Sequence, residues 1–276
     1  MYEEALPYFI FSVWAVLALY IAISRGGLRR IYPRDERPLA AVFVPLTLAA
    51  FFLYILFQGV LIPLIARLFI CKEDICIASN GLLTIISDIG IVASALAVTA
   101  LSLLPPIRHT IWGEGNYLVK FLRGARWWLF VYPIAVIFSS IIKLILHLLV
   151  DYSVSTQVAV DFLMKLLDNP WLFYLNGFLV AFVVPVSEEL LFRGFLYNAL
   201  KGFLSIKVAI VLSALCFSLF HFDVSQSITN IELISVIFLL GLVLAWVYER
   251  EKSIWASIGL HATFNFVSIL SIMFEK

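Results

Sequence analysis

Charge is scarce in this sequence, and the scarcity excludes most classes of soluble protein. Only 13% of the 276 residues are charged and 63% are hydrophobic, which lies outside the usual composition of soluble globular domains. The formal net charge is only +1, and no basic run interleaved with aromatic residues suggests a nucleic-acid partner. We therefore expect a multi-pass membrane protein whose partners are membrane lipid and a peptide or lipidated protein substrate.

Cysteines are also few, and signs of processing are absent. Cys71 and Cys76 flank a short polar loop, and a disulfide between them stays open at this point. Cys216 lies in an apolar run and is predicted to be a small buried hydrophobic residue. Glu3 and Glu4 stand where a signal peptide would be basic. We therefore expect the first apolar segment to remain in the mature protein.

Long apolar segments are the dominant feature of what is present. A membrane-spanning helix needs about 20 apolar residues, and the sequence offers eight candidates, near residues 5–24, 39–65, 81–103, 127–150, 171–200, 206–222, 232–248 and 253–272. The predicted fold is all-α and polytopic, with about eight transmembrane helices. The connection 105–126, rich in proline, glycine and basic residues, is predicted to be a solvated loop, with an amphipathic surface helix as the alternative.

Basic residues are distributed unequally between the two sets of loops. The loops after the first, third, fifth and seventh segments carry 14 lysines and arginines, against 4 on the other side. Cytoplasmic loops carry the excess of basic residues. This rule places the first set of loops on the cytoplasmic side of the cell membrane and predicts that both termini are external.

Two adjacent carboxylates, Glu188 and Glu189, and one arginine, Arg193, lie inside the apolar segment 171–200. Charges within a bilayer are costly unless paired, so such a cluster indicates function. On a helix, Glu189 and Arg193 share a face and are predicted to form a salt bridge. Glu188 is rotated by about 100° and has no partner in its own helix.

Hairpin geometry predicts that His221 is the partner of Glu188. If segments 171–200 and 206–222 are antiparallel, the midpoint between positions 188 and 221 falls in their connecting turn. Both residues then lie roughly 25 Å from that turn. His221 and Glu188 could share a proton or a water molecule, as general base catalysis requires.

His261 and Asn265 form a second polar pair, four residues apart on one face of the last segment. Such a pair could stabilise the oxyanion that forms at a scissile carbonyl. His261 lies only about 16 Å from the nearest turn, so it is level with Glu188 only if the hairpin of the fifth and sixth segments extends further into the cytosol. We therefore expect a cavity that opens to the cytoplasmic side.

Each of these polar residues also has a purely structural interpretation. A lone intramembrane histidine more often serves helix packing than catalysis, and Lys143 with His147 are assigned to that class. Asp88, Gln58 and Asn176 are candidate interhelical hydrogen-bond partners without a functional role. The structural interpretation requires six polar residues to be buried independently of one another. A single functional site accounts for all six and is therefore the simpler interpretation.

Three motifs carry a family resemblance: Glu188-Glu189-x-x-x-Arg193, Phe217-x-x-x-His221 and His261-x-x-x-Asn265. In this order they resemble the CPBP intramembrane protease family, which includes type II CAAX prenyl endopeptidases, bacteriocin-processing proteins and abortive-infection proteins. The resemblance covers residues 171–266, a protease-like core within a single membrane domain, 1–276. The N-terminal part with four predicted helices, 1–150, has no comparable motif.

The resemblance implies eight helices around a conical cavity and hydrolysis of a peptide bond. It implies that Glu188 and His221 activate water, that His261 and Asn265 stabilise the oxyanion, and that Glu189, Arg193 and Phe217 support them. No cofactor is expected, and no catalytic metal because His-Glu-x-x-His is absent, although glutamate and histidine can bind zinc. Cleavage of prenylated CAAX proteins is one option for the substrate.

Two other classes of function stay open. The chain could be a non-catalytic immunity or scaffold protein of the same fold. It could also be a proton-coupled transporter, since buried glutamate and histidine serve as proton relays, but the polar positions cluster toward one side of the bilayer. A serine mechanism through Ser218 and His221 lacks a Gly-x-Ser-x-Gly elbow and an orienting third residue.

Overall fold

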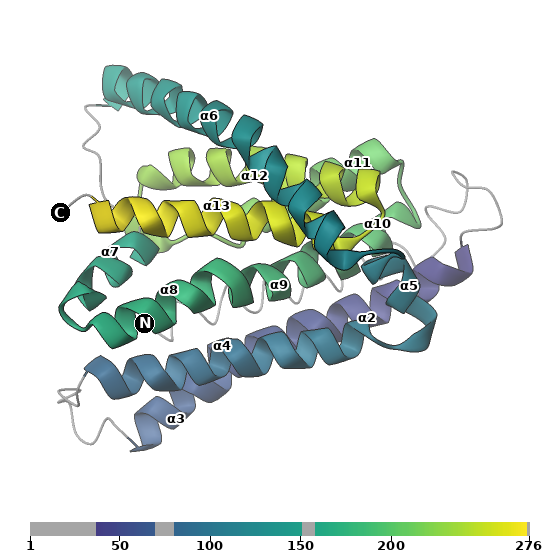
Figure 1. Ribbon diagram of the computed structural model, residues 1–276, viewed down its shortest axis with the longest axis horizontal. Coiled ribbons are helices and arrows are strands. Elements are labelled where there is room, and N and C mark those ends of the chain that lie inside the picture. Colours follow the sequence, from purple (N-terminus) through teal and green to yellow (C-terminus); the bar gives the residue numbers. More distant parts are fainter. Residues whose placement is uncertain (1–36, 70–79, 151–157, 275–276) are drawn as a thin grey trace.

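The computed structural model describes residues 37–69, 80–150 and 158–274, which form helices and turns with no strand among them. The predicted segment 5–24 and the Cys71–Cys76 loop lie outside these residues. In chain order the elements are α2 (Arg37–Ile55), the π-helix η1 (Leu56–Leu61), α3 (Ile62–Phe69), α4 (Asn80–Ser102), α5 (Pro105–Trp112), α6 (Tyr117–Val150), α7 (Val158–Lys165), the 3-10 helix η2 (Leu166–Asp168), α8 (Pro170–Phe178), the π-helix η3 (Leu179–Val183), α9 (Val184–Glu189), the π-helix η4 (Leu190–Tyr197), α10 (Asn198–Lys201), α11 (Ile206–Leu219), the 3-10 helix η5 (Val224–Gln226), α12 (Thr229–Glu251) and α13 (Ile254–Phe274) (Figure 1).

Six helical stretches in the described part of the chain are long and apolar enough to cross a membrane. They are Ala41–Ile65, Gly81–Ser102, Tyr117–Val150, Pro170–Lys201, Thr229–Glu251 and Ile254–Phe274, and the shorter α11 is apolar as well. The prediction of an all-α, multi-pass membrane protein is confirmed. The sixth predicted segment, 206–222, is indeed short, because its helix ends at Leu219.

Most of these helices run side by side, whereas α6 crosses α12 and α13 obliquely (Figure 1). Two glycines make the crossing of α6 and α13 close. A Cβ at Gly124 would lie 1.7 Å from the Ala256 carbonyl oxygen, and a Cβ at Gly259 would lie 2.1 Å from the Phe121 carbonyl oxygen. No side chain fits at either position, so the two glycines set the place of α13 against α6.

The prediction of a solvated loop over residues 105–126 is wrong. The helix α5 and the first turns of α6 occupy most of it, and only residues 113–116 remain as a connection. Ile107 and Ile111, one turn apart on α5, are fully buried, so α5 has one apolar face directed into the protein. Two of the basic residues pair with Glu251: Lys120 Nζ donates to its carbonyl at 3.1 Å, and Arg123 Nη1 lies 3.5 Å from its carboxylate. The burial of the two isoleucines favours a helix here, although the proline, glycine and basic residues of the segment are typical of a loop.

The prediction that Cys216 is a buried residue is wrong, because its side chain is exposed. The inward face of α11 consists of Ser213, Ala214, Phe217 and Ser218, and Cys216 lies on the opposite side. An apolar residue in a membrane protein has no need of burial within the protein, because the hydrocarbon of the bilayer is itself apolar. Apolar surroundings in the sequence therefore do not indicate burial here.

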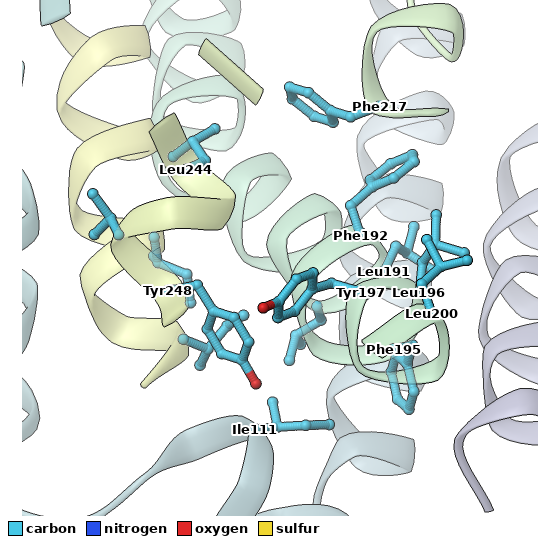
Figure 2. Packing of buried hydrophobic residues seen from close by; sticks show 14 of the residues in the cluster. Ile111, Leu191, Phe192, Phe195, Leu196, Tyr197, Leu200, Phe217, Leu244 and Tyr248 are labelled. Carbon is cyan, nitrogen blue, oxygen red and sulfur yellow. The ribbon is translucent and has the colours of Figure 1, made fainter. Parts of the chain in front are cut away.

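The segment Pro170–Lys201 is the central helix of the structure. A larger share of it is buried than of any other candidate span in the described residues, and η4 is buried throughout. Its aromatic residues pack in perpendicular pairs, Phe192 on Phe217 with ring centroids 5.2 Å apart and Tyr197 on Tyr248 at 5.7 Å (Figure 2). The two carboxylates thus lie on the best-enclosed helix of the molecule.

Two π-helices, η3 and η4, flank the short helix α9 that carries Glu188 and Glu189. Single π-helical turns inside α-helices occur frequently at functional sites. The altered backbone leaves carbonyl groups for side chains to satisfy. The Asn198 amide donates to the Gly194 carbonyl at 2.8 Å and to the Arg193 carbonyl at 3.1 Å. Within the membrane such groups must find partners inside the protein.

Candidate active site

Glu189 and Arg193 form the salt bridge that their spacing predicts. Arg193 Nη1 donates to Glu189 Oε1 at 2.9 Å, and both side chains are fully buried. Arg193 Nη2 also donates to the Gly241 carbonyl at 3.1 Å. The guanidinium therefore links η4 to α12 as well as neutralising one carboxylate.

Glu188 lies between the two histidines. His221 Nε2 is 3.8 Å from Glu188 Oε1, and His261 Nε2 is 3.7 Å from Glu188 Oε2. The structure therefore brings Glu188 level with both histidines, although one lies in the turn after α11 and the other within α13. The His221 side chain is 29% exposed and that of Glu188 is 8% exposed, so the site is enclosed but reachable at His221.

The hydrogen bonds of the two imidazoles place a proton on the Nδ1 atom of each ring. His221 Nδ1 is 2.9 Å from the Phe217 carbonyl oxygen, and His261 Nδ1 is 2.9 Å from Glu189 Oε1. A carbonyl oxygen and a carboxylate can only accept, so both Nδ1 atoms donate. Each Nε2 is then directed at one oxygen of Glu188. A histidine held in this way by a carboxylate or a carbonyl has a fixed ring orientation.

The formal charges of the cluster leave one carboxylate without a permanent cation. Glu188 and Glu189 carry two negative charges and Arg193 carries one positive charge, so one negative charge faces the histidines alone. The Nε2–oxygen distances of 3.7 and 3.8 Å are too long for direct hydrogen bonds. A water molecule beside Glu188 and His221 could bond to both.

The Phe217 ring contacts three side chains of the cluster. The Arg193 guanidinium lies 4.3 Å above its ring centroid, and the rings of His221 and His261 meet it in T-shaped contacts at 4.9 and 5.7 Å. Its own carbonyl accepts from His221. The spacing Phe217-x-x-x-His221 therefore has a physical basis, because the phenylalanine and the histidine share one helical face.

Asn265 has one amide hydrogen committed to the backbone. Its Nδ2 donates at 2.9 Å to the carbonyl of Val180, which belongs to η3. Nδ2 carries two hydrogens, so the second is left for another acceptor. The structure thus fastens α13 to the π-helix that precedes the glutamates, a link that the sequence did not indicate.

The other polar residues pair away from these groups. Asn176 donates to Asp88 at 3.3 Å and Gln58 donates to Ser94 at 3.1 Å, which confirms that these residues serve as interhelical hydrogen-bond partners. Lys143 forms an ion pair with Glu232 at 3.3 Å. These contacts join α4 to its neighbours and α6 to α12.

A cavity of about 180 Å³ lies between α5, α10 and α12, lined by residues that include Asn198, Lys201 and Glu249. None of the predicted site residues belongs to its lining. Within the described ranges, no group of three or more His, Cys, Asp or Glu side chains is arranged to hold a metal ion.

Comparison with known proteins links this region to a family of proteases. Residues 170–267 match the Rce1-like type II CAAX prenyl endopeptidases. A stretch of 88 residues is 28% identical to the UPF0177 protein YxdF of Lactococcus lactis subsp. lactis (strain IL1403), and covers 32% of this chain and 45% of that protein. The match therefore spans less than half of that relative. No solved structure matches the chain.

The matched residues include every group of the cluster described above. Glu188, Glu189 and Arg193 lie near the start of residues 170–267, and His261 with Asn265 lie near the end. Over residues 170–267 the chain is therefore similar to the Rce1-like type II CAAX prenyl endopeptidases, in agreement with the resemblance that its three motifs indicate.

Proposed function

We propose that this protein is an intramembrane endopeptidase that hydrolyses a peptide bond with water activated by Glu188 and His221. The observation that carries the proposal is the convergence of both imidazole Nε2 atoms on the two oxygens of Glu188. A structural role for the cluster would need only neutralisation of Glu189 by Arg193. It would not require a second carboxylate placed between two oriented histidines.

The proposed reaction begins with a water molecule held by Glu188 and His221. Glu188 accepts one proton from the water, and the oxygen attacks the scissile carbonyl to give a tetrahedral intermediate. His261 takes part as the doubly protonated imidazolium, whose Nε2–H donates to the oxyanion together with the free amide hydrogen of Asn265. The intermediate then collapses, the carbon–nitrogen bond breaks, and the proton on Glu188 passes to the leaving amine.

Glu189, Arg193 and Phe217 hold these groups in place. Glu189 accepts from Arg193 and from His261 through the same oxygen, so the ring of His261 is oriented by an ion pair that is itself buried. Phe217 lies against both imidazoles and the guanidinium. Hydrogen-bonded partners of this kind raise the precision of a catalytic group.

The proposed site faces the cytoplasmic side of the cell membrane, the orientation that the distribution of basic loop residues favours. Its substrate is a peptide or a lipidated protein, with a prenylated CAAX sequence as the first candidate because the matched family consists of CAAX prenyl endopeptidases. No metal or other cofactor takes part in the proposed reaction.

The test is cleavage of quenched fluorescent peptides by the purified protein in liposomes. Prenylated CAAX peptides and their unprenylated counterparts form the panel, so the panel also reports substrate class. Glu188→Gln and His221→Ala should lower cleavage by at least 10²-fold, while Glu251→Gln, which alters a surface ion pair with Arg123, should not. Cleavage in both site variants at the level of the unmodified protein would refute the proposal, and loss of cleavage on dialysis against a chelator would refute its metal-free form.

A further inference from the structure

A tyrosine from the N-terminal half of the chain lies on a helix that packs against the segment just after Glu188. Tyr54 belongs to α2, which packs against both η4 and α10. The start of α2 lies near α10 and its later turns lie near η4, so α2 is antiparallel to the helix that carries Glu188. None of the three motifs reaches α2, and the matched region starts only at residue 170.

The register of this antiparallel pair follows from one aromatic contact. The rings of Phe51 and Phe192 meet at 5.3 Å in a T-shaped arrangement. Tyr54 is three residues beyond Phe51 and Glu188 is four residues before Phe192, so both positions lie about one helical turn further in the same direction. The axial displacements are about 4.5 and 6 Å. Tyr54 is therefore level with Glu188 along the direction of the two helices, one turn beyond the contact of α2 with η4.

Phe220 joins this pair to His221. Its ring lies 5.7 Å from that of Tyr54 and 5.5 Å from that of Phe192. Phe220 is also the residue directly before His221 in the chain. Tyr54 thus packs against the residue that precedes His221 in the chain.

We propose that the Tyr54 hydroxyl is a positioning residue for Glu188: it donates a hydrogen bond that orients the carboxylate and favours its ionised form. This inference rests on the proposed function, in which Glu188 must be ionised to accept a proton from water. The other charged or titratable groups around Glu188 are His221, which follows α11, His261 on α13, and the adjacent ion pair of Glu189 and Arg193. Tyr54 is the contribution of α2, a helix that carries none of these other groups.

The experiment compares Tyr54→Phe with Tyr132→Phe, both in the full-length protein in liposomes. Tyr132 also lies in a membrane-spanning helix and packs against Phe264 and Trp128, so its variant controls for loss of a hydroxyl from a packed aromatic ring. Tyr54→Phe should lower kcat about tenfold with little change in KM, because a hydrogen bond to a charged group is lost and the peptide is not contacted. Tyr132→Phe should leave both constants unchanged.

A second readout does not depend on peptide cleavage. Dicyclohexylcarbodiimide modifies protonated carboxyl groups in apolar surroundings, and mass spectrometry measures its attachment to Glu188, with Glu188→Gln as the blank. Hydrogen bonds to the ionised form favour ionisation, so at one fixed pH Tyr54→Phe should increase the rate of labelling severalfold over the Tyr132→Phe control.

The two measurements separate the two proposals. Faster labelling in Tyr54→Phe supports the role of the tyrosine even if the unmodified protein cleaves none of the peptides, an outcome that would count against the proposed function alone. Equal labelling rates in Tyr54→Phe and Tyr132→Phe would overturn the role of Tyr54, whether or not the protein cleaves peptides.

Discussion

The crossing of α6 and α13 predicts that one methyl group at Gly259 disables the site from a distance. In Gly259→Ala the new Cβ would lie 2.1 Å from the Phe121 carbonyl oxygen, whereas ordinary contacts begin at 3.4 Å. The two helices must therefore separate by about 1 Å, which costs roughly 1–3 kcal/mol as overpacking does elsewhere. His261 follows two residues later, and its bond to Glu189 of 2.9 Å would lengthen beyond hydrogen-bonding range.

The matched control is Gly177→Ala on α8, where the new Cβ would lie 3.5 Å from the nearest atom, on Ile269 of α13. Here the substitution should be neutral or should stabilise by up to about 1 kcal/mol, because alanine favours helix more than glycine.

Thermal unfolding in detergent and the rate of peptide cleavage are measured for both variants. A displacement of 1 Å at a catalytic group can cost about 10²-fold in rate, so Gly259→Ala should lose both stability and cleavage. The reasoning is refuted if Gly259→Ala unfolds and cleaves like Gly177→Ala.

Three further predictions concern buried hydrogen bonds. Arg193→Met should lower the free energy of unfolding by about 3–5 kcal/mol, because Glu189 is left as an uncompensated buried charge, and denaturation of the double variant with Glu189→Gln should recover most of that loss. Asn265→Ala should reduce kcat by about 10²–10³-fold, the usual cost of an oxyanion donor; steady-state rates close to those of the unmodified protein would rule out that role. Tyr248→Phe removes the hydroxyl that accepts from Asn198 at 2.7 Å and should cost about 1–3 kcal/mol in thermal unfolding, with cleavage by the folded fraction unaltered.

Local geometry was the part of the site that sequence could predict. The pairing of Glu189 with Arg193 depends only on a four-residue spacing within one helix, and the structure has it at 2.9 Å. The match of Glu188 with His221 depends on one hairpin, and it too is present. The resemblance of the three motifs added the prediction that His261 belongs beside them, which the distance of 3.7 Å from Glu188 bears out.

The depth of His261 shows why the hairpin argument alone left a gap. Counted from its nearest turn, His261 should lie shallower than Glu188. The structure places Lys201, just before the turn at residues 202–205, beside Glu249, just before the end of α12, with Nζ 3.1 Å from Oε2. His261 Nε2 nevertheless lies 3.7 Å from Glu188 Oε2, so the two groups are level in the structure.

Contacts between distant segments were beyond prediction from one sequence. Tyr54 carries no motif, and its position depends on the register of α2 against η4, which one contact between Phe51 and Phe192 reveals. The glycines at 124 and 259 resemble any other glycine in an apolar run until the two helices cross. The prediction of a loop over residues 105–126 failed for the same reason, because the burial of Ile107 and Ile111 depends on neighbours that local sequence does not specify.

The length of α6 ties the geometry of the site to the thickness of the bilayer. Its 34 residues span about 51 Å, well beyond a hydrocarbon core of about 30 Å. A helix longer than the membrane adjusts its tilt to the local thickness. Because α6 meets α13 backbone to backbone at two glycines, we expect a change in that tilt to displace the helix that holds His261, and lipid composition to influence how the histidine meets Glu188.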